Sequence, residues 1–268
     1  MVKTAFIGAG RMASAIVDGL IAKSPDEKSK IRCFSASGTS ATALSQRTGI
    51  SHADDLPALL ADAEVVVVAF KPQHLASADP RLAELTAGKI VLSVLAAKTV
   101  AQLATVFPRA RNIIRTMPNT PSAIGAGITG WCAKNELSED DRTVVVSLLG
   151  AIGREIEILE SKIDGLMGVS GCGPAFVFEF TASLRDGGVA AGLTLEEAEQ
   201  LAIETVLGSA RLMARSSLSP EELRNQVTSP HGTTYAGLQR MAAHDIRGIM
   251  KEAVLAAKAR SEELSRTS

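Results

Sequence analysis

Short apolar runs and longer amphipathic segments alternate along the first 160 residues of the chain. Runs rich in Val, Ile and Phe, which are typical of buried strands, lie at residues 2–8, 31–35, 64–70 and 89–96. Apolar positions with helical spacing follow the first two runs, at residues 12–23 and 41–49. Strands that alternate with helices form βαβ units, so the pattern predicts an α/β fold with a parallel sheet.

The pattern changes after Glu160. Three more strands are predicted before it, at residues 111–119, 125–133 and 153–160, with a helix at residues 137–153. Beyond it every segment has helical spacing, at residues 174–193, 194–216, 219–227 and 246–266. Two of these begin with helix-start residues: Thr194 with Glu197 as a capping box, and Ser219 followed by Pro220. We therefore predict an α/β N-terminal domain over residues 1–160, followed by an all-α C-terminal domain over residues 161–268.

The composition limits the possible partners. The 268 residues carry a formal net charge of −1 and contain one Trp and one Tyr, which disfavours nucleic acid. The longest apolar run, residues 65–70, is too short to cross a bilayer, and Gly8, Gly10, Arg11 and Asp18 interrupt any signal-peptide core. The three cysteines are far apart, so we expect no disulfide framework and no metal site, and a soluble protein of the reducing cytoplasm.

A glycine motif stands directly after the first predicted strand. Gly8, Gly10 and Ala13 form G-x-G-x-x-A at the start of a helix. The first glycine permits a tight turn, the second lets the backbone approach a pyrophosphate, and the small third residue permits close packing of helix and strand. The helix N-terminus adds N–H donors for phosphate. The motif indicates a dinucleotide site, and the alternative is an ordinary turn between strand and helix.

The ends of later strands suggest which nucleotide binds. Ser35, Ser37 and Thr39 follow the second strand where an NAD site usually offers a carboxylate, and hydroxyls favour the 2′-phosphate of NADPH over NADH. Lys71, before Pro72, ends the next strand, at the edge where such sheets bind ligands. These residues are also compatible with an ordinary polar loop.

Small residues end one further strand, and three later loops are rich in Gly, Pro and hydroxyl residues. Ala96 and Ala97 leave room for the nicotinamide ribose. The three loops are residues 115–122, 170–174 and 229–234. In the first, prolines around Asn119 and Thr120 predict a rigid, extended turn with exposed side chains, either a domain connection or a wall of the nicotinamide site. The last is read either as a turn or as an anion site.

With these stretches in view, the chain resembles the pyrroline-5-carboxylate reductase family. The resemblance runs through GAGRM, FKPQ, RTMPNTPSAIGAGITG, SGCGPAFVF, GGVAAGL and VTSPHGTTYAGL, in the family's order. It implies a Rossmann domain followed by a helical dimerisation domain. It also implies NAD(P)H-dependent reduction of 1-pyrroline-5-carboxylate to L-proline, the last step of proline biosynthesis. The expected cofactor is NADPH, with NADH possible, and the expected assembly is a homodimer within a higher homo-oligomer, a decamer.

The resemblance also assigns residues to the site. The implied cofactor contacts are Gly8, Ala9, Gly10, Arg11, Met12, Ser35, Ser37, Phe70, Lys71, Pro72, Leu95, Ala96 and Ala97. The implied substrate contacts are Glu160, Gly232, Thr233 and Thr234. The chain departs from the family at Arg11, Met167, Cys172, Ala97 and His231, and the last two stand where the family usually has Gly.

The anion site gains a chemical reason from this substrate, a cyclic imine with a carboxylate. Thr233 and Thr234 at a helix N-terminus offer backbone N–H groups to that carboxylate. We expect Thr234 to form a hydrogen bond with the ring nitrogen and to be the catalytic residue. His231 is a second possible proton donor, with surface polarity as the alternative.

Two other functions fit the same layout. A β-hydroxyacid-dehydrogenase-type oxidoreductase would use a lysine of the helical half, where the lysines after Glu160 are Lys162, Lys251 and Lys258. A non-catalytic NADP-binding regulatory protein would keep the fold without turnover.

Overall fold

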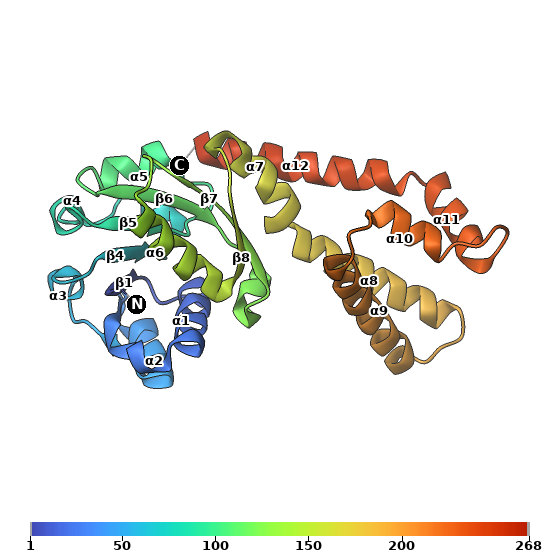
Figure 1. Ribbon diagram of the computed structural model, residues 1–268, viewed down its shortest axis with the longest axis horizontal. Helices are drawn as coiled ribbons and strands as arrows, with labels where there is room; N and C mark the ends of the chain where they lie inside the picture. Colours follow the sequence, from blue (N-terminus) through green and yellow to red (C-terminus); the bar gives the residue numbers. More distant parts are fainter. Residues whose placement is uncertain (1, 267–268) are drawn as a thin grey trace. The chain divides into compact units, whose positions relative to one another are not determined.

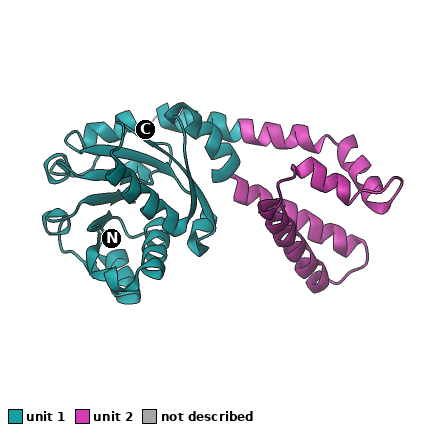
Figure 2. Cartoon of the chain, in the orientation of Figure 1, with its two compact units in different colours: residues 1–171, 256–268 teal, residues 172–255 magenta. Residues whose placement is uncertain are grey.

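The computed structural model describes residues 2–266 and forms two compact units (Figures 1 and 2). One unit runs up to residue 171 and includes the residues from 256 onward; the other is formed by residues 172–255. The long helix α12, Ile246–Arg266, begins in the second unit and ends in the first.

The first unit is built around an eight-stranded sheet with the order β3-β2-β1-β4-β5-β6-β7-β8. The strands are β1 Thr4–Ile7, β2 Ile31–Phe34, β3 Ser51–His52, β4 Val65–Val68, β5 Ile90–Ser93, β6 Asn112–Met117, β7 Gly127–Ala133 and β8 Gly153–Glu157. The helices are α1 Arg11–Lys23, α2 Thr39–Thr48, α3 Leu56–Leu60, α4 Leu82–Leu85, α5 Val100–Val106, α6 Glu139–Leu149 and α7 Ile163–Leu166. This confirms the predicted α/β domain.

Helices cover both faces of this sheet, and β4 shows how the sequence achieves it. Val65 and Val67 pack on one face with apolar residues of α1, α2 and α6. Val66 and Val68 pack on the other face with residues of α3, α4 and α5. Because side chains alternate along a strand, a strand buried on both faces must be apolar at every position.

The sheet differs from the prediction at two places. All neighbouring strands are parallel except β6 and β7, which are antiparallel. Residues 118–126, which join them, are too few for the crossover that a parallel pair requires. The second difference is strand β3, which was not predicted because its two residues are exposed and form no apolar pattern.

The loop after β6 also corrects an expectation. Residues Thr120–Ile124 form a short 3₁₀ helix instead of an extended turn. Asn119 is buried, its side chain donating to the Ser170 carbonyl at 3.1 Å and accepting from the Ile128 N–H at 3.0 Å. A buried amide must find partners for its polar atoms, so Asn119 joins this loop to β7 and to the segment before Cys172 instead of pointing into solvent.

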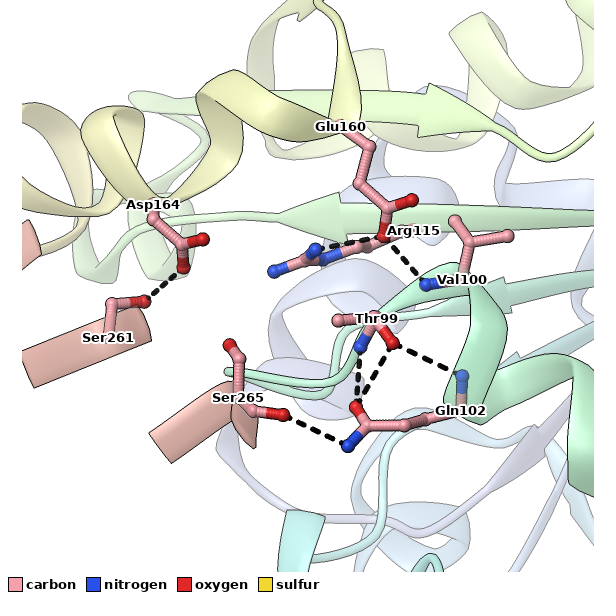
Figure 3. A network of polar contacts seen from close by, with 8 residues as sticks. All are labelled: Thr99, Val100, Gln102, Arg115, Glu160, Asp164, Ser261 and Ser265. Carbon is pink, nitrogen blue, oxygen red and sulfur yellow. Dashed lines mark hydrogen bonds and ion pairs between the residues drawn. The ribbon is translucent and has the colours of Figure 1, made fainter. Parts of the chain in front are cut away.

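The compact units divide the chain at a different place from residue 160. Ile163 in α7 is buried with Val100 and Cys132 against the sheet. The Ser261 hydroxyl of α12 donates to the Asp164 carboxylate at 2.6 Å, and the Gln102 amide donates to the Ser265 carbonyl at 3.1 Å (Figure 3). These contacts place residues 161–171 and the end of α12 with the sheet.

The second unit contains helices only, as the sequence predicts. They are α8 Gly173–Ala190, α9 Leu195–Arg215, α10 Pro220–Gln226, α11 Thr233–Ala243 and the first part of α12. The predicted starts are confirmed: Thr194 and Glu197 form a capping box, and Ser219 caps α10 with Pro220 in its first turn. Among residues 172–255, the buried apolar residues are Ala198 and Ala202. Side chains this small bury little apolar area, so this unit alone has almost no core.

Candidate functional site

Residues predicted to hold a dinucleotide line a cleft of about 730 Å³ at the carboxyl ends of β1, β2 and β4. Gly8, Ala9, Gly10, Ser35, Ser37, Phe70 and Lys71 contribute to its wall. In open α/β sheets, ligands bind outside the carboxyl ends of the strands. The structure therefore brings together three segments that are far apart in the sequence.

Both glycines of the motif have a physical reason. Gly8 has φ +104°, and a Cβ atom there would lie 2.5 Å from the Ala69 carbonyl carbon. Gly10 precedes α1, and a Cβ atom there would meet no protein atom within 4 Å. Gly8 is thus required by the fold, while the space at Gly10 is open to a ligand. Ala13 is fully buried under the sheet, as the close packing of helix and strand requires.

The N-terminus of α1 suits a phosphate group. No side chain caps it, and its first turn contains no acidic residue. The first N–H groups of a helix have no intrahelical acceptor and form the positive end of its dipole. The residues present therefore fit the pyrophosphate of a dinucleotide.

The serine loop after β2 is held in a defined shape. The Ser35 hydroxyl accepts from the Ala41 N–H of α2 at 3.1 Å, and the Ser35 carbonyl accepts from the Gly38 N–H at 2.8 Å. Ser35 is half-buried and Ser37 is exposed, both at the cleft. These contacts direct the loop toward α2, whose N-terminus begins at Thr39.

Several cleft residues were missed by the sequence interpretation. They are Ser40, Asp54, Asp55, His74, Ser77, Asp79 and Arg81. Asp55 caps α3 by accepting from the Ala58 N–H at 2.8 Å, and Arg81 binds both carboxylate oxygens of Asp79, which lowers the pKa of that carboxyl. Asp54 and Asp55 follow strand β3, which the sequence pattern did not predict. Their position at a strand end was therefore not apparent from the sequence.

The remaining predicted cofactor residues lie outside the cleft lining. Arg11 and Met12 form the first turn of α1, Pro72 begins the 3₁₀ helix Pro72–His74, and Leu95, Ala96 and Ala97 follow β5. The Leu95 side chain is buried in the core, so only its backbone is free to face a ligand. Their cofactor contacts stay predictions.

Ala97 and His231, where a glycine is usual in the family that the chain resembles, both have the backbone conformation of a glycine. Ala97 has φ +55° and His231 has φ +59°. Few residues other than glycine adopt this left-handed region, although His is enriched there. Both loops therefore have a positive φ at a residue other than glycine. The His231 ring also packs edge-on against Tyr235, with centroids 5.9 Å apart.

The predicted anion site lies in the second unit. Gly232 caps α11 in extended conformation, and Thr233 and Thr234 are the first helical residues. No side chain caps this helix, whereas Thr194 and Ser219 cap α9 and α10. A Cβ atom on Gly232 would lie 2.3 Å from the Ser229 hydroxyl oxygen, so a side chain would disturb the turn. The N–H groups at the start of α11 are thus left open to an anion.

Glu160 is part of an internal network in the first unit. One carboxylate oxygen, Oε1, accepts from the Val100 N–H at 2.7 Å and from the Arg115 guanidinium at 2.9 Å (Figure 3). Arg115 is buried, while the Glu160 side chain is 39% exposed. A substrate would therefore meet a carboxylate that already has two protein donors, and the predicted substrate contact stays a prediction.

No group of three His, Cys, Asp or Glu side chains within residues 2–266 is arranged to hold a metal ion. In the same part of the chain, no helix is long and apolar enough to span a membrane. All three cysteines are free, and burial raises the pKa of Cys33 and of Cys132 to about 11.

Models of known protein families match both halves of the chain. Residues 160–264 match the family model for pyrroline-5-carboxylate reductase dimerisation, and residues 3–97 match that of the coenzyme F420-dependent NADP oxidoreductases. A pyrroline-5-carboxylate reductase of Arabidopsis thaliana is 35% identical, covering 99% of this chain and 96% of its own.

Solved structures of pyrroline-5-carboxylate reductases also resemble this chain in their fold. A pyrroline-5-carboxylate reductase from Coxiella burnetii superimposes with a TM-score of 0.92 at 32% identity, covering 98% of each chain. A pyrroline carboxylate reductase from Plasmodium falciparum, solved with NADP bound, gives 0.85 at 26% identity, again over 98% of each chain. By its sequence along nearly its whole length and by its fold, this chain belongs to the pyrroline-5-carboxylate reductase family.

Proposed function

We propose that the protein reduces 1-pyrroline-5-carboxylate to L-proline with NADPH, as the last step of proline biosynthesis. The observation that carries the proposal is the uncapped N-terminus of α11 in the SPHGTT loop, in a chain of this family that also holds a dinucleotide cleft. A cyclic imine with a carboxylate needs a site for each of its two polar groups, and this loop offers open N–H groups beside two hydroxyls.

The cofactor is proposed to lie in the cleft with its pyrophosphate at the start of α1. The proposed contacts are Gly8, Ala9, Gly10, Arg11, Met12, Ser35, Ser37, Phe70, Lys71, Pro72, Leu95, Ala96 and Ala97. NADPH supplies the hydride when it is bound. The absence of a carboxylate directly after β2, with Ser35 and Ser37 in its place, supports NADPH over NADH.

The substrate is proposed to meet Glu160, Gly232, Thr233 and Thr234. Backbone N–H groups of α11 hold its carboxylate, and the Thr234 hydroxyl forms a hydrogen bond with the ring nitrogen. The ring carbon of the C=N bond gains a hydride and the nitrogen keeps a proton, which gives the secondary amine of proline. Because a protonated imine is already electrophilic, the protein's main task is to place the two reactants.

The functional unit is proposed to be a homodimer within a larger homo-oligomer, a decamer, in the cytoplasm. The support is the second unit, which buries Ala198 and Ala202 but exposes large apolar side chains such as Phe178 and Leu201. A second copy of the chain would cover them. Three free cysteines suit a reducing compartment.

A single assay tests the reaction. Purified protein is mixed with 1-pyrroline-5-carboxylate and NADPH, the loss of NADPH absorbance is followed, and proline is identified as product; the assay is then repeated with NADH. Rapid oxidation with proline formation supports the proposal. NADPH binding without oxidation would favour the non-catalytic regulatory protein instead.

A further inference from the structure

The loop between β5 and α5, residues 94–99, is held in an uncommon conformation. It contains three of the proposed cofactor contacts that lie outside the cleft lining, Leu95, Ala96 and Ala97. Ala97 has φ +55°, a region that alanine adopts far less readily than glycine. Such a conformation persists only where the surrounding structure fixes it. The contacts at the two ends of the loop therefore matter.

The start of the loop is tied to β6 through Thr116. The buried Thr116 hydroxyl donates to the Ser93 carbonyl at 2.9 Å, and the Ser93 hydroxyl in turn accepts from the Leu95 N–H at 3.2 Å. The last residue of β5 thus links the loop to the neighbouring strand.

The end of the loop is tied to β6 through Arg115 (Figure 3). Thr99 caps α5 in a capping box with Gln102, and the next residue, Val100, donates its N–H to Glu160. The same oxygen of Glu160 accepts from Arg115, whose side chain is 5% exposed. Two consecutive residues of one strand, Arg115 and Thr116, therefore fix both ends of the loop.

Arg115 decides where the Glu160 carboxylate lies. Glu160 is partly exposed, and an unpaired carboxylate in that position is free to turn toward water. The buried guanidinium is fixed within β6 and favours a charged partner at hydrogen-bond distance. With Glu160 held there, the Val100 N–H has an acceptor, and the end of loop 94–99 that leads into α5 stays in place.

We infer that Arg115 is a positioning residue which, through Glu160, holds loop 94–99 in the shape that places the nicotinamide end of the cofactor. The inference rests on the proposed reductase function. Arg115 itself is assigned no contact with substrate or cofactor.

The test compares Arg115→Met, Arg115→Lys and Glu160→Gln with the wild-type protein. Arg111→Met is the control, because Arg111 directly precedes β6 and pairs with Asp141 away from this loop. Four quantities are measured: the Kd of NADPH, the fluorescence of bound NADPH, kcat, and the thermal unfolding temperature. The fluorescence reports on the surroundings of the nicotinamide without any turnover.

We expect Arg115→Met to lower kcat about ten-fold and to reduce the fluorescence gain on binding. The Kd of NADPH should change less than about three-fold, because the cleft residues are untouched. Arg115→Lys should recover part of both losses. The fluorescence gain in Arg115→Met combined with Glu160→Gln should be no smaller than in Arg115→Met alone, since both act on the loop through one contact.

Wild-type fluorescence and kcat in a folded Arg115→Met variant would overturn the inference, as would fluorescence losses that multiply in the double variant. If Arg115→Met does not fold, Glu160→Leu, which has no acceptor for the Val100 N–H, takes its place: unchanged NADPH fluorescence then overturns the inference and reduced fluorescence supports it. A wild-type protein that binds NADPH but reduces no imine would reject the proposed function, while the fluorescence comparison would still decide the role of Arg115.

Discussion

At the scale of the residue, two hydroxyl side chains carry the proposed chemistry. Thr234 lies in the first turn of α11, beside the open N–H groups, and Ser35 lies at the cleft with its hydroxyl bonded to the backbone of α2. Each can be changed without removing a buried group, because Thr234 is exposed and Ser35 is only half-buried. Substitutions there therefore report on the ligands more than on the fold.

Replacing Thr234 tests the contact with the ring nitrogen. Thr234→Ala should lower kcat/KM for 1-pyrroline-5-carboxylate ten-fold or more, about 1.4 kcal/mol of lost stabilisation, with the Kd of NADPH unchanged. Thr181→Ala is the control, since that hydroxyl bonds the Val177 carbonyl of its own helix. Steady-state kinetics equal to wild type in Thr234→Ala would remove this residue from the mechanism.

Replacing Ser35 tests the choice of cofactor. An aspartate there can still accept from the Ala41 N–H but places a negative charge where the 2′-phosphate of NADPH is proposed to lie. Ser35→Asp should lower the ratio of kcat/KM for NADPH to that for NADH by about ten-fold or more. Asparagine has the same shape as aspartate but no charge, so Ser35→Asn should change this ratio much less. Equal ratios in the two variants would argue against a phosphate at Ser35.

At the scale of the element, strand ends and helix starts build both proposed sites. The cleft combines the turn after β1 with the segments that follow β2 and β4, and only the parallel order of the sheet brings them to one edge. The proposed substrate loop, residues 229–234, depends on one helix start that is left uncapped. The same kind of feature, open N–H groups at a helix N-terminus, is thus proposed to bind an anion in each unit.

The two glycines before α1 should respond differently to alanine. Gly8→Ala forces a Cβ atom onto the Ala69 carbonyl at positive φ, so the thermal unfolding temperature should fall markedly. Gly10→Ala meets no protein atom, so the unfolding temperature should stay near wild type while the affinity for NADPH falls at least ten-fold. NADPH binding by Gly10→Ala as tight as by wild type would show that the diphosphate lies elsewhere.

At the scale of the whole molecule, the two units differ in what they bury. The sheet unit has two apolar clusters, one on each face. The helical unit buries two alanines and exposes large apolar side chains on α8, α9 and α12. Because folding and association both depend on burial of apolar area, these exposed side chains support the proposed homo-oligomer.

A charge on the exposed apolar surface of α8 tests the proposed assembly. Phe178 is 65% exposed, and Phe178→Asp should convert the oligomer largely to smaller species in analytical ultracentrifugation, with a loss of stability. Ile156→Asp, at a 49% exposed position of the sheet unit, is the matched control and should leave the sedimentation unchanged. A wild-type protein that sediments as a monomer would refute the homo-oligomer outright.

The α/β domain, the helical half and the glycine turn can be predicted from the sequence alone, because these depend on local patterns. Apolar periodicity marks strands and helices, Thr194 with Glu197 marks a helix start, and Gly8 marks a turn that only glycine can form. The resemblance to a family indicates that residues 229–234 are a substrate loop. The residues alone are equally compatible with a turn.

Contacts between residues that are distant in the chain are known only from the folded structure. In the folded chain, β7 runs antiparallel to β6, Asn119 is buried, and residues 54–55 and 74–81 reach the cleft. Folding also brings Arg115 to Glu160 and Val100, residues separated by up to 60 positions. Periodicity records which face of an element is buried but not which element covers it, so such contacts exist only once the chain has folded.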